Sequence, residues 1–102
     1  MTLKSSALGF VVLLFAMPVF GADGDALYAE KGCNTCHGPT GNEPIVATYP
    51  RIAGQNREYL VRQIQDIKDG SRDNGASVAM QVMVANLSDA EIAAIADYLS
   101  KL

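Results

Sequence analysis

Hydrophobic residues recur at helical spacing in two stretches of the second half of the chain. Leu60, Ile64 and Ile67 fall at i, i+4 and i+7, which predicts one buried face on a helix over residues 56–69. The second stretch follows Ser88-Asp89-Ala90-Glu91, a capping box that marks the start of a helix. Its apolar stripe consists of Ile92, Ile95, Ala96 and Leu99, with Tyr98 at the border.

A shorter helix is expected over residues 24–31, with Asp23 or Asp25 as its cap and Gly32 at its end. Leu27 and Tyr28 would be its buried contacts. Residues 37–55 contain three Gly and three Pro without helical periodicity, which predicts a loop. Residues 71–79 are expected to form a polar surface loop. Since no β-hairpin signal is present, the sequence predicts an all-α domain of three to four helices.

The N-terminus has the features of a secretory signal peptide. Lys4 precedes an uncharged, mostly apolar run over residues 7–20, and the small residues Gly21 and Ala22 follow it. We expect a signal over residues 1–21 and a domain over residues 22–102. Cleavage after Ala22 and an uncleaved membrane anchor are the alternatives, although the run is short and contains Pro18.

Removing 21 of the 102 residues leaves 81, enough for one domain but few for a self-sufficient core. What remains carries seven Lys and Arg against eleven Asp and Glu, a net charge of −4. Nucleic-acid binding is therefore not expected, because it requires basic patches. The acidity suits docking to a basic patch on a partner protein, or serves solubility alone.

Cys33-Asn34-Thr35-Cys36-His37 is a C-x-x-C-H motif, the attachment signature of c-type haem. Each thiol can add to one haem vinyl group, and the adjacent imidazole can then bind the iron. A thiol–disulfide redox pair is the first alternative, but its usual βαβ setting is missing. A zinc site would lack a fourth ligand, and a disulfide across two residues would be strained and leave His37 unexplained.

His37 is the only histidine, so ligation by two histidines within one chain is excluded, and the single motif limits the chain to one haem. Met1 and Met17 lie in the expected signal, which leaves Met80 and Met83 as candidates for the sixth iron ligand. A thioether ligand favours ferrous iron and raises the reduction potential. Methionine is also common core filler, so the residues alone leave three readings: Met80, Met83 or an open site.

The chain resembles the class I c-type cytochromes, in particular the small periplasmic bacterial members and one half of the dihaem ones. The resemblance is carried by the haem motif with Gly38, Tyr49-Pro50-Arg51-Ile52-Ala53-Gly54-Gln55, Tyr59-Leu60-Val61-Arg62-Gln63-Ile64, Met80-Gln81-Val82-Met83, Leu87-Ser88-Asp89 and Tyr98-Leu99.

This resemblance implies a haem crevice lined by the helices, with the first and last helices crossing near Leu27, Ile95 and Tyr98. It implies that Met80 is the sixth ligand, which would make Met83 a buried neighbour. It also implies a hydrogen bond from the axial histidine to a proline-region carbonyl, for which Pro44 is the best match.

We therefore expect a soluble periplasmic protein that carries one electron on a single covalent haem c, held by Cys33 and Cys36 and ligated by His37 and Met80. It is not expected to be an enzyme or to bind a small-molecule substrate, since Asp89 and Glu91 suit helix capping better than catalysis. Its partners would be electron donor and acceptor proteins, a membrane oxidase or reductase among them. The protein itself is expected to be a monomer or a weak dimer. The alternative is a haem enzyme subunit or a ligand sensor with an open or labile sixth site.

Overall fold

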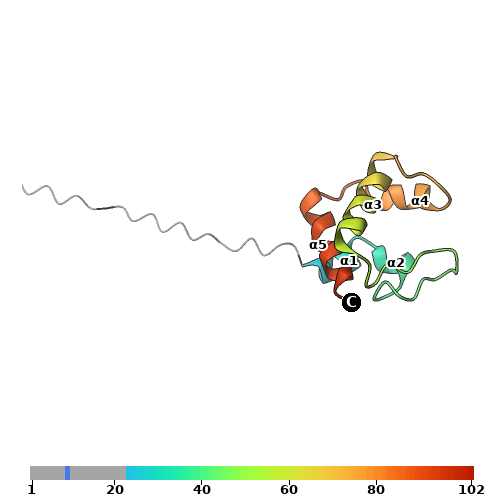
Figure 1. Ribbon diagram of the computed structural model, residues 1–102, viewed down its shortest axis with the longest axis horizontal. Helices are drawn as coiled ribbons and strands as arrows, with labels where there is room; N and C mark the ends of the chain where they lie inside the picture. The colour runs from blue at the N-terminus through green and yellow to red at the C-terminus, as the bar shows by residue number, and fades with distance from the viewer. Residues whose placement is uncertain (1–8, 10–22) are drawn as a thin grey trace, which may run out of the picture.

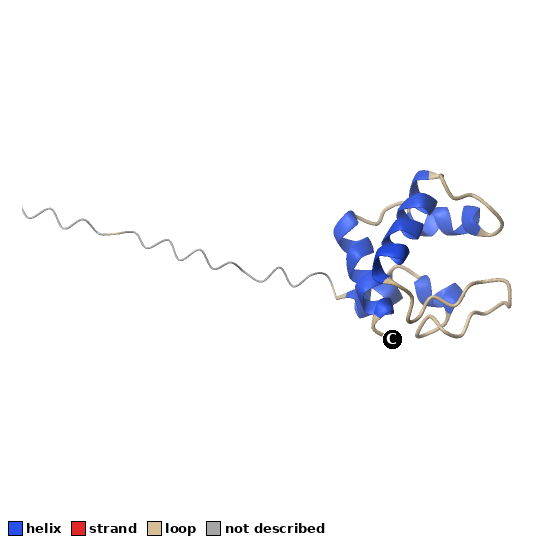
Figure 2. Cartoon of the chain, viewed as in Figure 1, coloured by secondary structure: helices blue, strands red, loops and turns tan. Residues whose placement is uncertain are grey.

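The computed structural model describes residue 9 and residues 23–102, so the expected signal peptide lies outside the described residues. The described part contains α1 (Gly24–Glu30), α2 (Cys33–His37), α3 (Arg57–Asp69), α4 (Ser77–Val84) and α5 (Asp89–Ser100). No strand occurs within it (Figure 2), which confirms the all-α class. Two short helices, α2 and α4, bring the number of helices above the expected three to four.

The helices α1 and α5 lie side by side near the C-terminus of the chain (Figure 1). Gly24 makes this contact close, because a Cβ atom there would overlap the carbonyl oxygen of Ala94. The rings of Tyr28 and Tyr98 meet at 5.8 Å between centroids, and Leu27 and Ile95 are both buried. The expected crossing of the first and last helices is confirmed.

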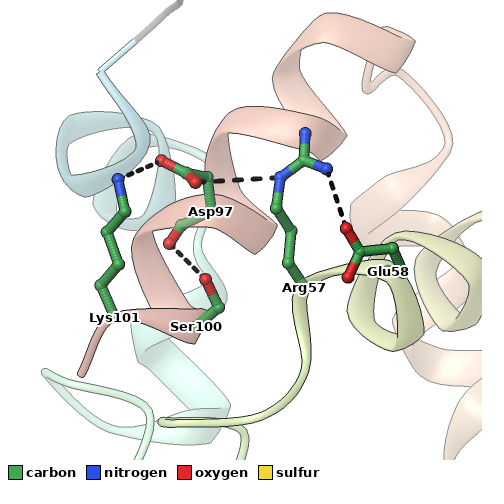
Figure 3. Close-up of polar contacts among 5 residues, drawn as sticks. All are labelled: Arg57, Glu58, Asp97, Ser100 and Lys101. Atoms are coloured by element: carbon green, nitrogen blue, oxygen red, sulfur yellow. Dashed lines mark hydrogen bonds and ion pairs between the residues drawn. The ribbon is translucent and has the colours of Figure 1, made fainter.

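The helix α3 packs against both α5 and α4. Asn56 caps its first turn by accepting a hydrogen bond from the Tyr59 amide at 2.9 Å, and the expected residues Leu60, Ile64 and Ile67 are buried. Its start is also linked to the last turns of α5 (Figure 3), where Arg57 lies 3.8 Å from Oδ1 of Asp97 and Lys101 lies 2.9 Å from Oδ2 of the same carboxylate. These side chains are exposed, so the link adds little to stability.

The helix α5 begins as the capping box predicts. The hydroxyl of Ser88 accepts from the Glu91 amide at 3.1 Å, and the Glu91 carboxylate accepts from the Ser88 amide at 3.0 Å. All four expected stripe residues, Ile92, Ile95, Ala96 and Leu99, are buried.

The prediction that residues 71–79 form a surface loop was wrong for its last three residues, because α4 begins at Ser77. The residue before it, Ala76, has no side chain that can cap a helix, so the sequence carries no start signal. The helix start relies on main-chain contacts instead, among them the Ser77 amide donating to the Asn74 carbonyl at 3.1 Å.

Within residues 23–102, none of the helices is by itself long and apolar enough to cross a membrane; α4 and α5 meet the requirement only as a pair bent by 120°.

Replacing Gly24 with alanine tests the α1–α5 contact. The added methyl group must displace the Ala94 carbonyl or the Tyr98 side chain, so the free energy of unfolding should fall by about 1–3 kcal/mol. Ala26→Ser, on the exposed face of the same helix, should change it by no more than about 0.5 kcal/mol. Urea denaturation of the two purified variants measures both values, and equal midpoints would contradict the close contact.

Candidate functional site

A cavity of about 490 Å³ lies between α2, α3, α4 and the loop that follows α2. Residues of both α2 and α4 line it, and these two helices lie apart in the view of Figure 1. Much of its wall is apolar, with Leu60, Ile64, Ile67, Val84, Leu87, Ile95 and Leu99 among the lining residues. The five residues that the sequence put forward as a site, Cys33, Cys36, His37, Met80 and Met83, all line this one cavity.

The short helix α2 places both motif cysteines on one wall, because residues i and i+3 share a helix face. Gly32 separates α2 from α1 with a φ of 79°, a left-handed conformation that favours glycine. Both thiols are free and half-buried. Burial raises the pKa of the Cys33 thiol, which keeps it neutral.

His37 is nearly buried, with 7% of its surface exposed. Its Nδ1 lies 2.9 Å from the carbonyl oxygen of Pro50, and since a carbonyl only accepts, Nδ1–H is the donor. This fixes the neutral tautomer in which Nε2 keeps a lone pair for a metal ion.

The prediction that His37 donates a hydrogen bond to the carbonyl of Pro44 was wrong. The amide of the next residue, Ile45, donates to the Cys36 carbonyl at 3.1 Å, which holds this part of the loop against the main chain of α2. The loop then turns back, with the Ile52 amide donating to Gly41 at 2.8 Å, and it is Pro50 that reaches the imidazole.

Tyr28 is a site residue that the sequence marked only as a buried contact. Its hydroxyl donates to the carbonyl of Gly38, the residue after His37, at 2.5 Å. Burial of the ring raises the pKa of Tyr28 to about 12, so the hydroxyl remains a donor. The sequence could have indicated this role, because a tyrosine on the buried face of a helix needs a hydrogen-bond partner for its hydroxyl.

The two methionines occupy different settings on α4. Met80 is half-buried and packs against the hydrophobic core, whereas Met83 is 47% exposed. The expectation that Met83 is a buried neighbour was therefore wrong. Met80 lies within the helix α4, whose main-chain hydrogen bonds define its backbone position.

The residues present fit a haem. Two thiols on one helix face, an imidazole with a free Nε2, and thioether sulfurs across an apolar cavity form a suitable donor set. Within residues 23–102, no three His, Cys, Asp or Glu side chains are grouped so that they could hold a metal ion by themselves, which gives the zinc alternative no support.

Comparisons with known proteins agree with this chemistry. The sequence model of the family described as Cytochrome c matches residues 21–102. A cytochrome c4 of Pseudomonas aeruginosa is 38% identical over 96 residues, covering 88% of this chain and 46% of the relative. A cytochrome c-553 of Nitratidesulfovibrio vulgaris is 37% identical over 81 residues, covering 79% of this chain and 78% of the relative.

The crystal structure of reduced cytochrome c4 from Pseudomonas stutzeri is 31% identical, with a TM-score of 0.69, and the match covers 78% of this chain and 46% of that one. The chain thus spans about half the length, or less, of the cytochromes c4 that it matches.

Tyr28→Phe tests the contact between the Tyr28 hydroxyl and the main chain next to His37. The ring is kept, but the buried Gly38 carbonyl keeps only the Gly41 amide as a donor, so we expect stability toward urea to fall by about 0.5–1.5 kcal/mol. Tyr98→Phe is the matched control, since no hydrogen bond of the Tyr98 hydroxyl is recorded among the described residues. Equal losses in both variants would contradict a specific role for the Tyr28 hydroxyl.

Proposed function

The chain belongs to the cytochrome c family, and we propose that it carries single electrons on one haem c, with His37 and Met80 as the axial ligands, in the periplasm. The observation that carries this proposal is the geometry of His37. Its imidazole is buried at the cavity wall and held in one tautomer by Pro50, directly beside two free thiols.

Cys33 and Cys36 are the residues proposed to attach the haem through thioether bonds. When bound, the haem supplies an iron that changes between the ferric and ferrous states. The chain's part is to keep the ligands in place during that change. His37 is held by Pro50, and its neighbour Gly38 is held by Tyr28, so the imidazole needs little rearrangement when the charge changes.

Met80 is supported over Met83 by its surroundings. The core contact of Met80 orders its side chain at the cavity, whereas an exposed side chain such as Met83 loses more conformational freedom on binding iron. A thioether ligand stabilises ferrous iron, as suits a protein that receives and passes on electrons.

The carboxylates of the described residues do not suggest catalysis at the cavity. Glu91 completes the capping box of α5 and pairs with Lys31 at 3.3 Å. No Asp or Glu is among the residues that line the cavity. We therefore propose a carrier and not an enzyme.

Periplasmic location is proposed from the signal-like residues 1–21, with the cytochrome domain over residues 22–102. The partners are proposed to be donor and acceptor proteins, since cytochromes c act with redox partners. The excess of acidic residues over basic ones, eleven against seven outside the signal region, would steer the chain toward basic docking patches.

Covalent attachment is checked with Cys33 and Cys36 both replaced by serine. The wild-type protein should keep its haem through denaturing electrophoresis and acid–acetone extraction, while the double variant should lose it. The double variant should also fold poorly. Without haem the apolar residues that line the cavity have nothing to pack against, and a chain of 81 residues has few other core contacts. Release of haem from the wild type by the extraction would rule out the thioether bonds.

The sixth ligand is checked by comparing Met80→Ala with Met83→Ala. The first should abolish the weak far-red absorption band of methionine-ligated ferric haem and lower the potential. The second should keep the band and, because Met83 is 47% exposed, cost less stability than the roughly 2–5 kcal/mol of a core methionine.

The reverse pattern in the two spectra would move the ligand to Met83. A wild-type protein without the far-red band would favour the alternative function, a haem enzyme or sensor with an open sixth site.

A further inference from the structure

The cavity is lined by basic side chains in a chain that is acidic. Three of its lining residues, Lys31, Arg51 and Arg72, are basic, and none is acidic. Outside residues 1–21 the chain has eleven acidic residues against seven basic ones, so an even distribution would place more acids than bases at the cavity. The charge at the cavity wall is therefore suited to an anionic ligand group.

The three basic residues differ in how their charge is compensated. Lys31 forms an ion pair with Glu91 at 3.3 Å, and Arg51 is exposed to water. Arg72 is half-buried, and it forms no ion pair with any carboxylate of residues 23–102. Charges removed from water are normally paired, so the Arg72 guanidinium lacks the partner that its position calls for.

Arg72 is held in position by two contacts with α3. Its amide donates to the carbonyl of Asp66 at 2.9 Å, which fixes the backbone. Its Nη1 donates to Oε1 of Gln63 at 3.1 Å, and Gln63 also lines the cavity. A neutral amide orients the guanidinium without neutralising it.

We propose that Arg72 binds a propionate group of the haem and raises its reduction potential, with Gln63 as the positioning residue. A haem carries two carboxylates, and the planar guanidinium matches a carboxylate with two parallel hydrogen bonds. A fixed positive charge near the haem favours the ferrous state, which has one positive charge fewer than the ferric state. The inference rests on the proposed haem at α2, but not on which methionine is the sixth ligand.

The test compares haem-loaded Arg72→Gln with Arg62→Gln in a spectroelectrochemical titration. Both variants lose one positive charge, but Arg62 is exposed and pairs with Asp66, away from the residues that line the cavity. Arg72→Gln should shift the reduction equilibrium roughly tenfold toward the oxidised form, or about 59 mV for a one-electron couple. Arg62→Gln should shift it far less, and only Arg72→Gln should move the NMR signals of a haem propionate.

Equal shifts in the two variants, or unmoved propionate signals in Arg72→Gln, would overturn the proposal. Should Arg72→Gln fail to mature, Arg72→Lys and Gln63→Leu replace it. Arg72→Lys keeps the positive charge but cannot form two parallel hydrogen bonds with a carboxylate. Gln63→Leu keeps Arg72 but removes the hydrogen bond that positions its guanidinium. Lower potentials in both would support the proposal, and wild-type potentials in both would overturn it. A wild-type protein without covalent haem would instead refute the proposed function.

Discussion

The hydrogen bond from His37 Nδ1 to the Pro50 carbonyl is the contact on which the site depends. It joins the end of α2 to a loop residue thirteen positions later and selects the tautomer that leaves Nε2 free. The loop can hold Pro50 there because its own main chain is tied down, with Ile52 bonded to Gly41 and Gly54 bonded to Leu99 of α5. The position of the His37 ring therefore depends on the whole loop and not on the motif alone.

The helices α1 and α5 form the frame that supports this loop and the motif. Tyr28 on α1 holds Gly38, while Leu99 on α5 holds Gly54, so both ends of the loop are bonded to the same pair of helices. On the other side, α3 and α4 contribute apolar side chains whose inner faces line a cavity of about 490 Å³. A small domain of this kind gains much of its core from its cofactor, which explains why haem attachment and folding are expected to depend on each other.

The sequence predicted the parts of the fold that side chains encode locally. The spacing of Leu60, Ile64 and Ile67 and the capping box at Ser88 predicted α3 and α5, and the residues of the C-x-x-C-H motif line the cavity that forms the candidate site. It failed where main-chain contacts decide: α4 begins without a capping side chain, and the choice of Pro50 over Pro44 follows from how the loop folds back. The exposure of Met83 was missed for a related reason, since it depends on how α4, a helix that the sequence did not reveal, packs on α3.

Nitrogen-15 NMR of the His37 ring in the reduced, haem-loaded protein tests the central claim most directly. The account predicts a slowly exchanging proton on Nδ1, hydrogen-bonded to the Pro50 carbonyl, and an Nε2 without a proton because it binds the iron. A proton on Nε2, or an Nδ1 without a proton, would contradict it.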